Sequence, residues 1–377
     1  MVKMRLRCLK FFAIHFCFLA NYPLLHSQGC CSGGSGSPIA GNASQGVLAQ
    51  HQMELASSLQ YIYSDKFLTG NGESSPLFQS FSSKYLYNRV AYGITKDLTI
   101  SLEGGYYLNK TQTELNAAGK IQSSGFGDMI IFPRYDILNR KRLDKHDELT
   151  IGLGYKIPLG KYNDSHVVFT NPTTGRQYFT ISPPLVQPTN GSQDVLFYLF
   201  YMHSGWPKNI RFFANSMYIK KGWNALGEKF GDFTAVNVFV SRTFMHSLGI
   251  TLQCNAEWVQ KMRYNENVDV LALYNVDVNS TGSKKISLIP QFSYSYKTCT
   301  IYGLAEVPLY QKVQGTQIGI QQQFTMGLSY RFFTKKDLKC DDAGNDFTYM
   351  CPMKCKGGGS NSPGICSVCG MQLDKVK

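Results

Sequence analysis

The segment LTISLEGGYYLN, residues 98–109, alternates apolar and polar side chains along the chain. One face carries Leu98, Ile100, Leu102, Tyr106 and Leu108, and the other carries Thr99, Ser101, Glu103, Tyr107 and Asn109. A period of two residues is that of a β-strand with two unlike faces. The run is longer than most strands of soluble proteins and long enough to cross a bilayer at a tilt. It predicts a membrane-crossing strand.

Runs of this kind follow one another through most of the chain, with short links at one end and longer links at the other. This alternation is typical of an outer-membrane barrel, and an even number of strands places both termini in the periplasm. We therefore predict an all-β fold, a transmembrane antiparallel β-barrel of about 12 strands over residues 51–333. The runs lie near residues 51–64, 81–94, 97–109, 126–138, 147–160, 193–204, 208–221, 230–243, 247–261, 284–297, 299–311 and 316–333.

A soluble β-sandwich is the alternative for this region, because its strands also alternate. Its polar face would meet bulk water and carry many Lys and Glu residues. Here the polar face is mainly Ser, Thr, Gly, Gln and Asn, and only 17% of the chain is charged. This composition favours a membrane barrel whose polar face lines a water-filled lumen.

The N-terminal residues 1–28 have the pattern of an export signal, with four positive charges followed by a short apolar core and a small-residue exit. Residues 29–50 follow as a flexible periplasmic segment rich in Gly and Ser. A lipid anchor on Cys30 is an alternative for the mature N-terminus. The net charge of +13 does not indicate nucleic-acid binding in an exported chain.

Charged residues on the polar face of the runs are candidates for lining the pore. They could set its selectivity, or they could solvate the lumen and fix the strand register. No Ser/His/Asp grouping can be placed on one rim, so we expect no enzyme. The pore-lining candidates are Arg89, Glu103, Asp128, Arg134, Asp136, Lys156, Glu257, Glu306 and Arg331.

The chain ends in a cysteine cluster after a charged linker, residues 334–346. In residues 347–377, Cys351 and Cys355 are separated by a Gly-rich loop from Cys366 and Cys369. Two close pairs of thiolates can form a tetrahedral site that suits Cu(I), Zn(II) or Ag(I). Met353 and Met371 could add thioether ligands or form the core of this small module. A purely structural zinc site and two disulfide bonds are the alternatives.

Two resemblances extend these predictions. From residue 29 to residue 333 the chain resembles the outer-membrane transporter family named for the meta-pathway of phenol degradation, through SPIAG, the even set of long strands, and LSYRF at the end of the barrel. The tail, with CPM at 351–353 and PGICSVCGM at 363–371, resembles the heavy-metal-binding domain of copper P-type ATPases and copper/silver efflux adaptors. In that domain His and Pro usually follow the Met, whereas here Lys354 and Cys355 stand there.

The resemblances imply an outer-membrane channel with a periplasmic metal-binding tail, linked to the handling of copper or other heavy metals. Expected partners are outer-membrane lipid and periplasmic efflux or metal-handling proteins, with no nucleic acid. The alternatives are a passive transporter of small hydrophobic or aromatic compounds with a structural zinc tail, and a scaffold barrel whose lumen is filled.

Overall fold

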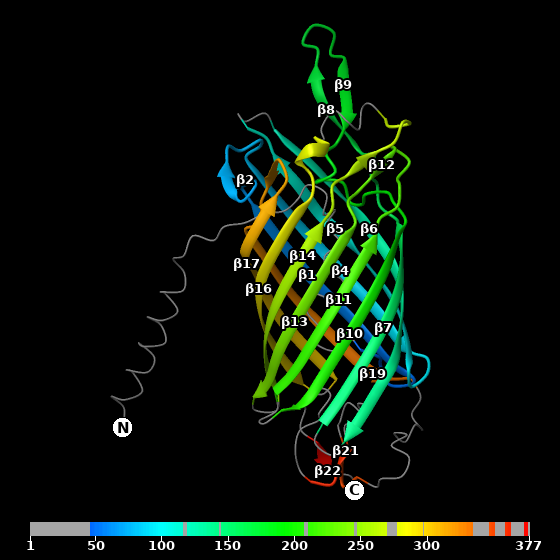
Figure 1. The fold of residues 1–377 in the computed structure, drawn as a ribbon. Coiled ribbons are helices and arrows are strands. Elements are labelled where there is room, and N and C mark those ends of the chain that lie inside the picture. Colours follow the sequence, from blue (N-terminus) through cyan, green and yellow to red (C-terminus); the bar gives the residue numbers. More distant parts are fainter. Residues whose placement is uncertain are drawn as a thin grey trace, which may run out of the picture.

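A closed barrel of twelve antiparallel strands forms most of the molecule (Figure 1). The computed structural model describes residues 46–115, 119–142, 145–206, 210–244, 247–269, 277–296, 298–334, 347–350, 359–362 and 373–375. Neighbouring strands along the chain pair with each other, and β1 closes the barrel on β19. The barrel strands are β1 (Gln52–Ser64), β4 (Ser80–Gly93), β5 (Leu98–Thr113), β6 (Lys120–Arg142), β7 (Lys145–Pro158), β10 (Asp194–Trp206), β11 (Ile210–Lys220), β13 (Phe233–Phe244), β14 (Leu248–Val259), β16 (Ser283–Tyr296), β17 (Cys299–Val313) and β19 (Gln322–Phe333).

The barrel confirms the predicted fold class, and several strand boundaries differ from the predicted runs. The last predicted run, 316–333, is split: β18 (Thr316–Ile318) joins a small sheet outside the barrel, and β19 starts only at Gln322. β6 extends to Arg142 and β7 starts at Lys145, so pairing continues through most of residues 139–146, the charged stretch between two of the predicted runs. Alternation alone could not show these boundaries because loop strands alternate as barrel strands do.

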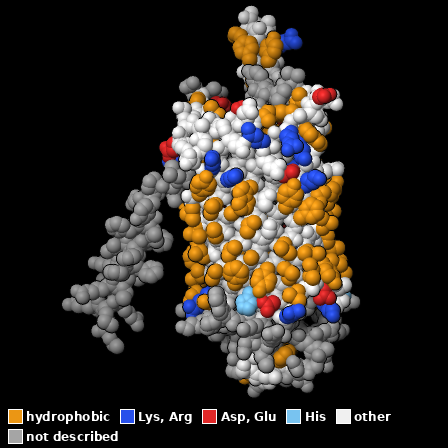
Figure 2. All heavy atoms as spheres, viewed as in Figure 1, with side chains coloured by type: hydrophobic (Ala, Val, Ile, Leu, Met, Phe, Trp, Pro, Cys, Tyr) orange, Lys and Arg blue, Asp and Glu red, His pale blue; other side chains and the backbone are white. Residues whose placement is uncertain are grey.

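The outward face of the barrel is a band of apolar side chains. Leu102, Leu199 and Leu252 are 47%, 46% and 49% exposed and lie on three different strands. Figure 2 shows this band around the visible face, between two levels where charged side chains gather. Such a band is the surface that a barrel presents to lipid. In the described part of the chain, no helix has the length and apolar character needed to cross a membrane.

The two ends of the barrel differ in structure (Figure 1). The long-loop end carries a projecting hairpin, two small sheets and one turn of 3₁₀ helix. At the opposite end, short turns join the strands. The elements of the long-loop end are β2 (Phe67–Thr69), β3 (Gly72–Ser74), β8 (Ser165–Thr170), β9 (Gln177–Ile181), β12 (Glu228–Lys229), β15 (Arg263–Tyr264), the 3₁₀ helix η1 (Val278–Ser280) and β18. Beyond the short-turn end lies a sheet of β20 (Tyr349–Met350), β21 (Gly359–Ser360) and β22 (Asp374–Lys375).

Residues 46–50 do not form the flexible segment that the sequence predicted for residues 29–50. The Val47 N–H donates a hydrogen bond to Glu148 Oε1 at 3.2 Å, and the Leu48 N–H donates to Thr99 Oγ1 at 2.8 Å. Leu48 is buried. Thr99 and Glu148 lie near the short-turn ends of β5 and β7, so this segment packs inside the mouth of the barrel. The segment is ordered because Leu48 is buried and because its backbone N–H groups donate to side chains on the inward face of the barrel.

Candidate functional site

The inward face of the barrel carries a network of ion pairs. Glu54 on β1 is bonded to Arg89 on the neighbouring strand β4 and to Arg331 on β19. On the nearby strand β16, Lys285 Nζ lies 2.9 Å from Glu257 Oε2 of β14 and 2.7 Å from Glu306 Oε1 of β17. Burial of such charges requires pairing. The first of these clusters crosses the seam at which β1 and β19 close the barrel.

The structure places all nine predicted pore-lining residues on the inward face, with little exposure. Glu54 brings Arg89 and Arg331 together, Lys285 brings Glu257 and Glu306 together, and Lys156 bonds Asp128 at 3.1 Å. The remaining three lie elsewhere on the wall, where Glu103 accepts from Tyr87 and Asp136 accepts from Thr150. Inward charges that the prediction missed are Glu54, Lys110, Glu148, Asp194, Lys221 and Lys285. Strand parity was the signal for those that lie on strands, as for Glu54 beside the outward Leu55, whereas Lys221 follows the end of β11 and gave no such signal.

We predict that Glu54→Ala lowers the free energy of unfolding by about 3–5 kcal/mol, because it removes the carboxylate shared by two buried arginines. Urea titration of the purified barrel in lipid or detergent measures this difference. Glu73→Ala is the matched control: Glu73 pairs with Lys66 at 2.8 Å on the exposed surface, and such pairs contribute about 0–1 kcal/mol. Equal losses in both variants would contradict a structural role for the Glu54 cluster.

The opposite part of the inward face is apolar, which the sequence reading did not predict. Ten buried side chains from β6, β10, β11 and β13 pack together, and we call them the apolar strip. Its rings follow one another, with centroids 5.5 Å apart for Phe132–Tyr198, 6.1 Å for Phe200–Phe213 and 6.5 Å for Phe213–Phe239. The strip consists of Ile130, Phe132, Leu196, Tyr198, Phe200, Met202, Phe213, Met217, Ile219 and Phe239.

The signal for the apolar strip was a loss of alternation in β10. The stretch VLFYLFYM, residues 195–202, is apolar or aromatic on both faces. A strand of this kind is buried on one side and meets lipid on the other. The lumen is therefore not lined throughout by the small polar residues that the sequence predicted. Its wall is amphipathic, with paired charges on one part and aromatic rings on another.

Part of the long loop after β7 folds into the barrel, and we call residues 183–192 the inward segment. Lys110 Nζ donates to the Gln187 carbonyl at 2.7 Å, and the Ser123 hydroxyl donates to the Val186 carbonyl. Val186 is fully buried in a cluster with Phe81. Backbone carbonyls are thus satisfied by side chains of the wall, as a buried loop requires. The inward segment occupies the lumen at the long-loop end.

A second set of polar contacts fastens the C-terminal part of the inward segment. Thr189 donates to Asp128, and Lys156 donates to Asn190. Lys156 Nζ also lies 2.9 Å from Asp194 Oδ2, which Lys221 Nζ approaches to 3.0 Å. These bonds join the segment to β6, β7 and β10. They hold the segment against the inner wall of the barrel at the long-loop end.

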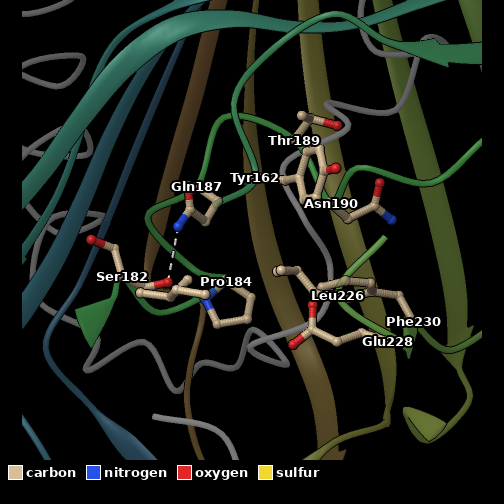
Figure 3. A pocket seen from close by; sticks show the side chains of 10 residues that line it. Tyr162, Ser182, Pro184, Gln187, Thr189, Asn190, Leu226, Glu228 and Phe230 are labelled. Carbon is tan, nitrogen blue, oxygen red and sulfur yellow. Dashed lines mark hydrogen bonds between the residues drawn. The ribbon is translucent and has the colours of Figure 1, made fainter. Parts of the chain in front are cut away.

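A cavity of about 10 Å³ lies between the inward segment and the loop that holds β12, with room for about one water molecule (Figure 3). Figure 3 shows Gln187, which donates to the Ser182 carbonyl, on one side of this cavity. Glu228 lies on the other side of the cavity. Asn224 Nδ2 donates both to Glu228 Oε2 at 2.8 Å and to the Asn190 carbonyl at 3.0 Å. Burial raises the pKa of Glu228, although the Asn224 hydrogen bond opposes the shift. Folding of this loop is therefore favoured at low pH and weakened as pH rises through the raised pKa.

In the C-terminal tail, the structure describes three short strands, which lie before, between and after the two cysteine pairs of the sequence. β20 pairs antiparallel with β21 and β22, so Met350 lies opposite Gly359 on one side and Asp374 on the other. The chain segments that enter and leave the cysteine-rich stretch are thus adjacent. The predicted ligands lie outside the described residues, and within the described ranges no three His, Cys, Asp or Glu side chains are grouped to hold a metal ion. Those ligands are Cys351, Cys355, Cys366, Cys369, Met353 and Met371.

Comparisons with known proteins match both parts of the chain. Residues 348–376 match the protein family described as "Heavy metal binding domain". The barrel is similar to the solved outer membrane channel from Pseudomonas putida F1, with a TM-score of 0.59 at 10% identity over 78% of this chain and 99% of that chain. A weaker likeness is to the beta domain of the Bordetella autotransporter BrkA, with a TM-score of 0.42 at 10% identity over 75% of this chain and 100% of that chain. A search of curated proteins gave no match.

The fold and the tail together define the class of the protein. The chain has the fold of an outer-membrane β-barrel channel. It ends in a heavy-metal-binding domain, which confirms the module predicted from the cysteine spacing.

Proposed function

We propose that the protein is an outer-membrane channel whose periplasmic tail holds a soft metal ion and links the channel to the handling of copper or another heavy metal. The observation that carries this proposal is the match of residues 348–376 to a heavy-metal-binding domain a short distance after the last barrel strand. A tail tethered by about a dozen residues stays within tens of ångströms of the pore mouth. It therefore raises the local concentration of bound metal there.

The orientation proposed for the barrel follows from its ends. Gln52 of β1 pairs with Phe333 of β19, so the chain enters and leaves the barrel at the same end, which carries the short turns. In outer-membrane barrels short turns face the periplasm and long loops face outward. Both termini would then be periplasmic, and the apolar band would contact outer-membrane lipid.

The metal proposed for the tail is Cu(I), Zn(II) or Ag(I), held by Cys351, Cys355, Cys366 and Cys369. Thiolates prefer soft ions, and four of them complete a tetrahedral shell. The ion would be captured, sensed or handed over in the periplasm, where an efflux or metal-handling protein is the proposed partner. We assign no enzymatic activity to the chain.

The test compares cells that express the full chain with cells that express a chain ending at Thr334. The proposal expects the truncated chain to reach the membrane in equal amount and to lower the growth tolerance of the cells to copper or silver salts. Unchanged tolerance to copper, silver and zinc would contradict the link to metal handling, while leaving the channel itself unaffected.

A second candidate function is passive transport of small hydrophobic or aromatic compounds. The specific observation in its favour is the apolar strip, because ring faces along a lumen offer successive contacts to an apolar solute. A hydrated metal ion gains nothing from such a surface. Uptake of an aromatic solute by intact cells that is unaffected by removal of residues 335–377 would favour this candidate.

A further inference from the structure

Two lysines stand side by side on the outward face of the barrel at its long-loop end. Lys284, near the start of β16, pairs directly in the register with Lys312, near the end of β17. Both side chains are exposed. Residues directly opposite each other in an antiparallel pair have Cβ atoms about 4.5–5.5 Å apart, and like charges at such positions repel. The pair is therefore unfavourable in the protein alone.

The next residue of β16 shows how the barrel pairs a lysine when it can. Lys285 points inward, where its Nζ lies 2.9 Å from Glu257 and 2.7 Å from Glu306. Among the side chains that the structure places, no carboxylate forms an ion pair with Lys284 or Lys312. Of two consecutive lysines, the inward one thus has two carboxylate partners, whereas the outward one faces a second lysine.

The acidic groups of the neighbouring loops are engaged elsewhere. β17 meets the sheet of β2, β3 and β18 where the Val313 N–H donates to the Gly70 carbonyl at 2.8 Å. Glu73 of that sheet pairs with Lys66. Asp277, which precedes β16, accepts hydrogen bonds from the backbone and side chain of the turn that follows it. The charge of the lysine pair is left for a partner from outside the chain.

The lysine pair lies at the edge of the outward apolar band. Trp258 of β14 pairs with Lys284 on the side away from Lys312, and it is 40% exposed. The next outward positions toward the middle of the band are Ile286 and Tyr310, which pair with each other and are also exposed. Figure 2 shows Lys and Arg side chains along this edge of the band. Aromatic rings beside cations mark the level where lipid headgroups meet acyl chains.

We propose that Lys284 and Lys312 together bind the phosphate of an anionic lipid in the leaflet at the long-loop end. A phosphate between the two ammonium groups accepts from both, so charge-assisted hydrogen bonds replace their mutual repulsion. The acyl chains of the lipid then lie along Ile286 and Tyr310, and Trp258 flanks the headgroup. With the orientation proposed above, this is the outer leaflet of the outer membrane.

The position of the pair favours a lipid over a free anion. Inorganic phosphate would give up its hydration for two exposed ammonium groups and would gain no apolar contact. A lipid is already held at this level by its acyl chains, so its phosphate meets the lysines at a high effective concentration. Near an anionic lipid surface, each basic residue strengthens binding by about fivefold.

The experiment measures lipid binding to the purified full chain in neutral detergent by native mass spectrometry, with diphosphoryl lipid A as the probe. The wild type is expected to bind one lipid A molecule more tightly than any further ones. Lys284→Gln and Lys312→Gln are each expected to weaken this first binding about fivefold, and the double variant about 25-fold. Phosphatidylcholine, which has no net charge, is expected to bind equally to all chains.

Lys84→Gln is the matched control. Lys84 is an exposed, outward lysine of β4 at the same end of the barrel, but it lies opposite Tyr61 and Asn109 rather than opposite a second lysine. Its replacement removes the same charge from the same level of the membrane. The first binding of lipid A is expected to be unchanged in this variant.

Thermal unfolding separates loss of the site from loss of the fold. Lys284→Gln and Lys312→Gln each remove a repulsion between like charges, so the lipid-free variants are expected to unfold at a temperature no lower than that of the wild type. Added lipid A is expected to raise the unfolding temperature of the wild type more than that of the double variant, because a ligand stabilises the state that binds it.

Three results would overturn the site. The first is equal affinity for lipid A in the wild type and the folded double variant. The second is an equal loss of affinity in Lys84→Gln, which would show a general attraction of the basic surface. The third is displacement of the first lipid A by inorganic phosphate at equal concentration, which would show a site for a free anion. The tail and the lumen take no part in these measurements, so the proposed function is tested separately.

Discussion

Replacement of Cys351, Cys355, Cys366 and Cys369 by serine is expected to abolish the binding of one soft metal ion per chain. Serine hydroxyls are poor ligands for Cu(I), Zn(II) or Ag(I), and a four-thiolate site contributes about 10 kcal/mol or more of binding free energy. The expected change is from one bound ion to none. The metal content of the purified full chain, measured after exposure to each ion under reducing conditions and dialysis, reports it.

The control for this prediction is a chain with Cys254→Ser and Cys299→Ser. These cysteines are unpaired, lie on β14 and β17, and are far in the sequence from the tail. The control should retain the metal. Equal metal content in the four-serine chain and the wild type would contradict a thiolate site in the tail. Four cysteines that resist thiol reagents until they are reduced would instead show two disulfide bonds.

Release of the inward segment is expected to raise the conductance of the barrel about tenfold, because a loop folded into the lumen restricts the pore. The variant replaces residues 184–189 by six Gly and Ser residues, which removes Val186 and Thr189 from their contacts with the wall. Single-channel recording in planar bilayers measures the step size. The wild type should give small or rare steps, since Lys110, Ser123 and Lys156 hold the segment in place.

The matched control makes the same replacement at residues 171–176, the turn between β8 and β9. This hairpin projects beyond the barrel rather than into it (Figure 1). Its replacement should leave the step size unchanged. A variant at 184–189 that conducts like the wild type would show that the inward segment does not limit the pore, and an increase in the hairpin variant would show a general loosening of the loops.

The sequence predicted the barrel well because lipid imposes a strict rule on each strand. Outward positions must be apolar, so Leu248, Ile250 and Leu252 alternate with polar residues and reveal both the strand and its faces. The interior obeys no such rule. Inward positions accept charges if they are paired and aromatic rings if they pack together, so β10 lost its alternation and the apolar strip was missed. Sequence analysis compares neighbours along the chain, whereas the strip is assembled from four strands.

The inward segment and the ion pairs show the same limit. Asp128 and Lys156 were recognised singly by strand parity, but their meeting with Thr189 and Asn190 depends on a loop that enters the lumen. A loop such as PPLVQPTNGS, residues 183–192, with three prolines and no regular alternation, gives no sign of its direction. The heavy-metal-binding tail was recognisable because its signal is local: four cysteines at fixed spacing within 19 residues, from Cys351 to Cys369.

The account depends on the outward face meeting lipid while the inward face does not, and two neighbouring residues of β14 test this directly. Cys254 is exposed on the outward face, and Gln253 is buried on the inward face, where it bonds Asn237. Two chains are compared in vesicles by spin labelling: one with Cys254 as its only cysteine, and one with Cys254→Ser and Gln253→Cys. The account predicts that oxygen dissolved in lipid relaxes the label at 254 much more strongly than the label at 253. Equal relaxation at both positions, or a label at 254 that only water-soluble nickel reaches, would contradict it.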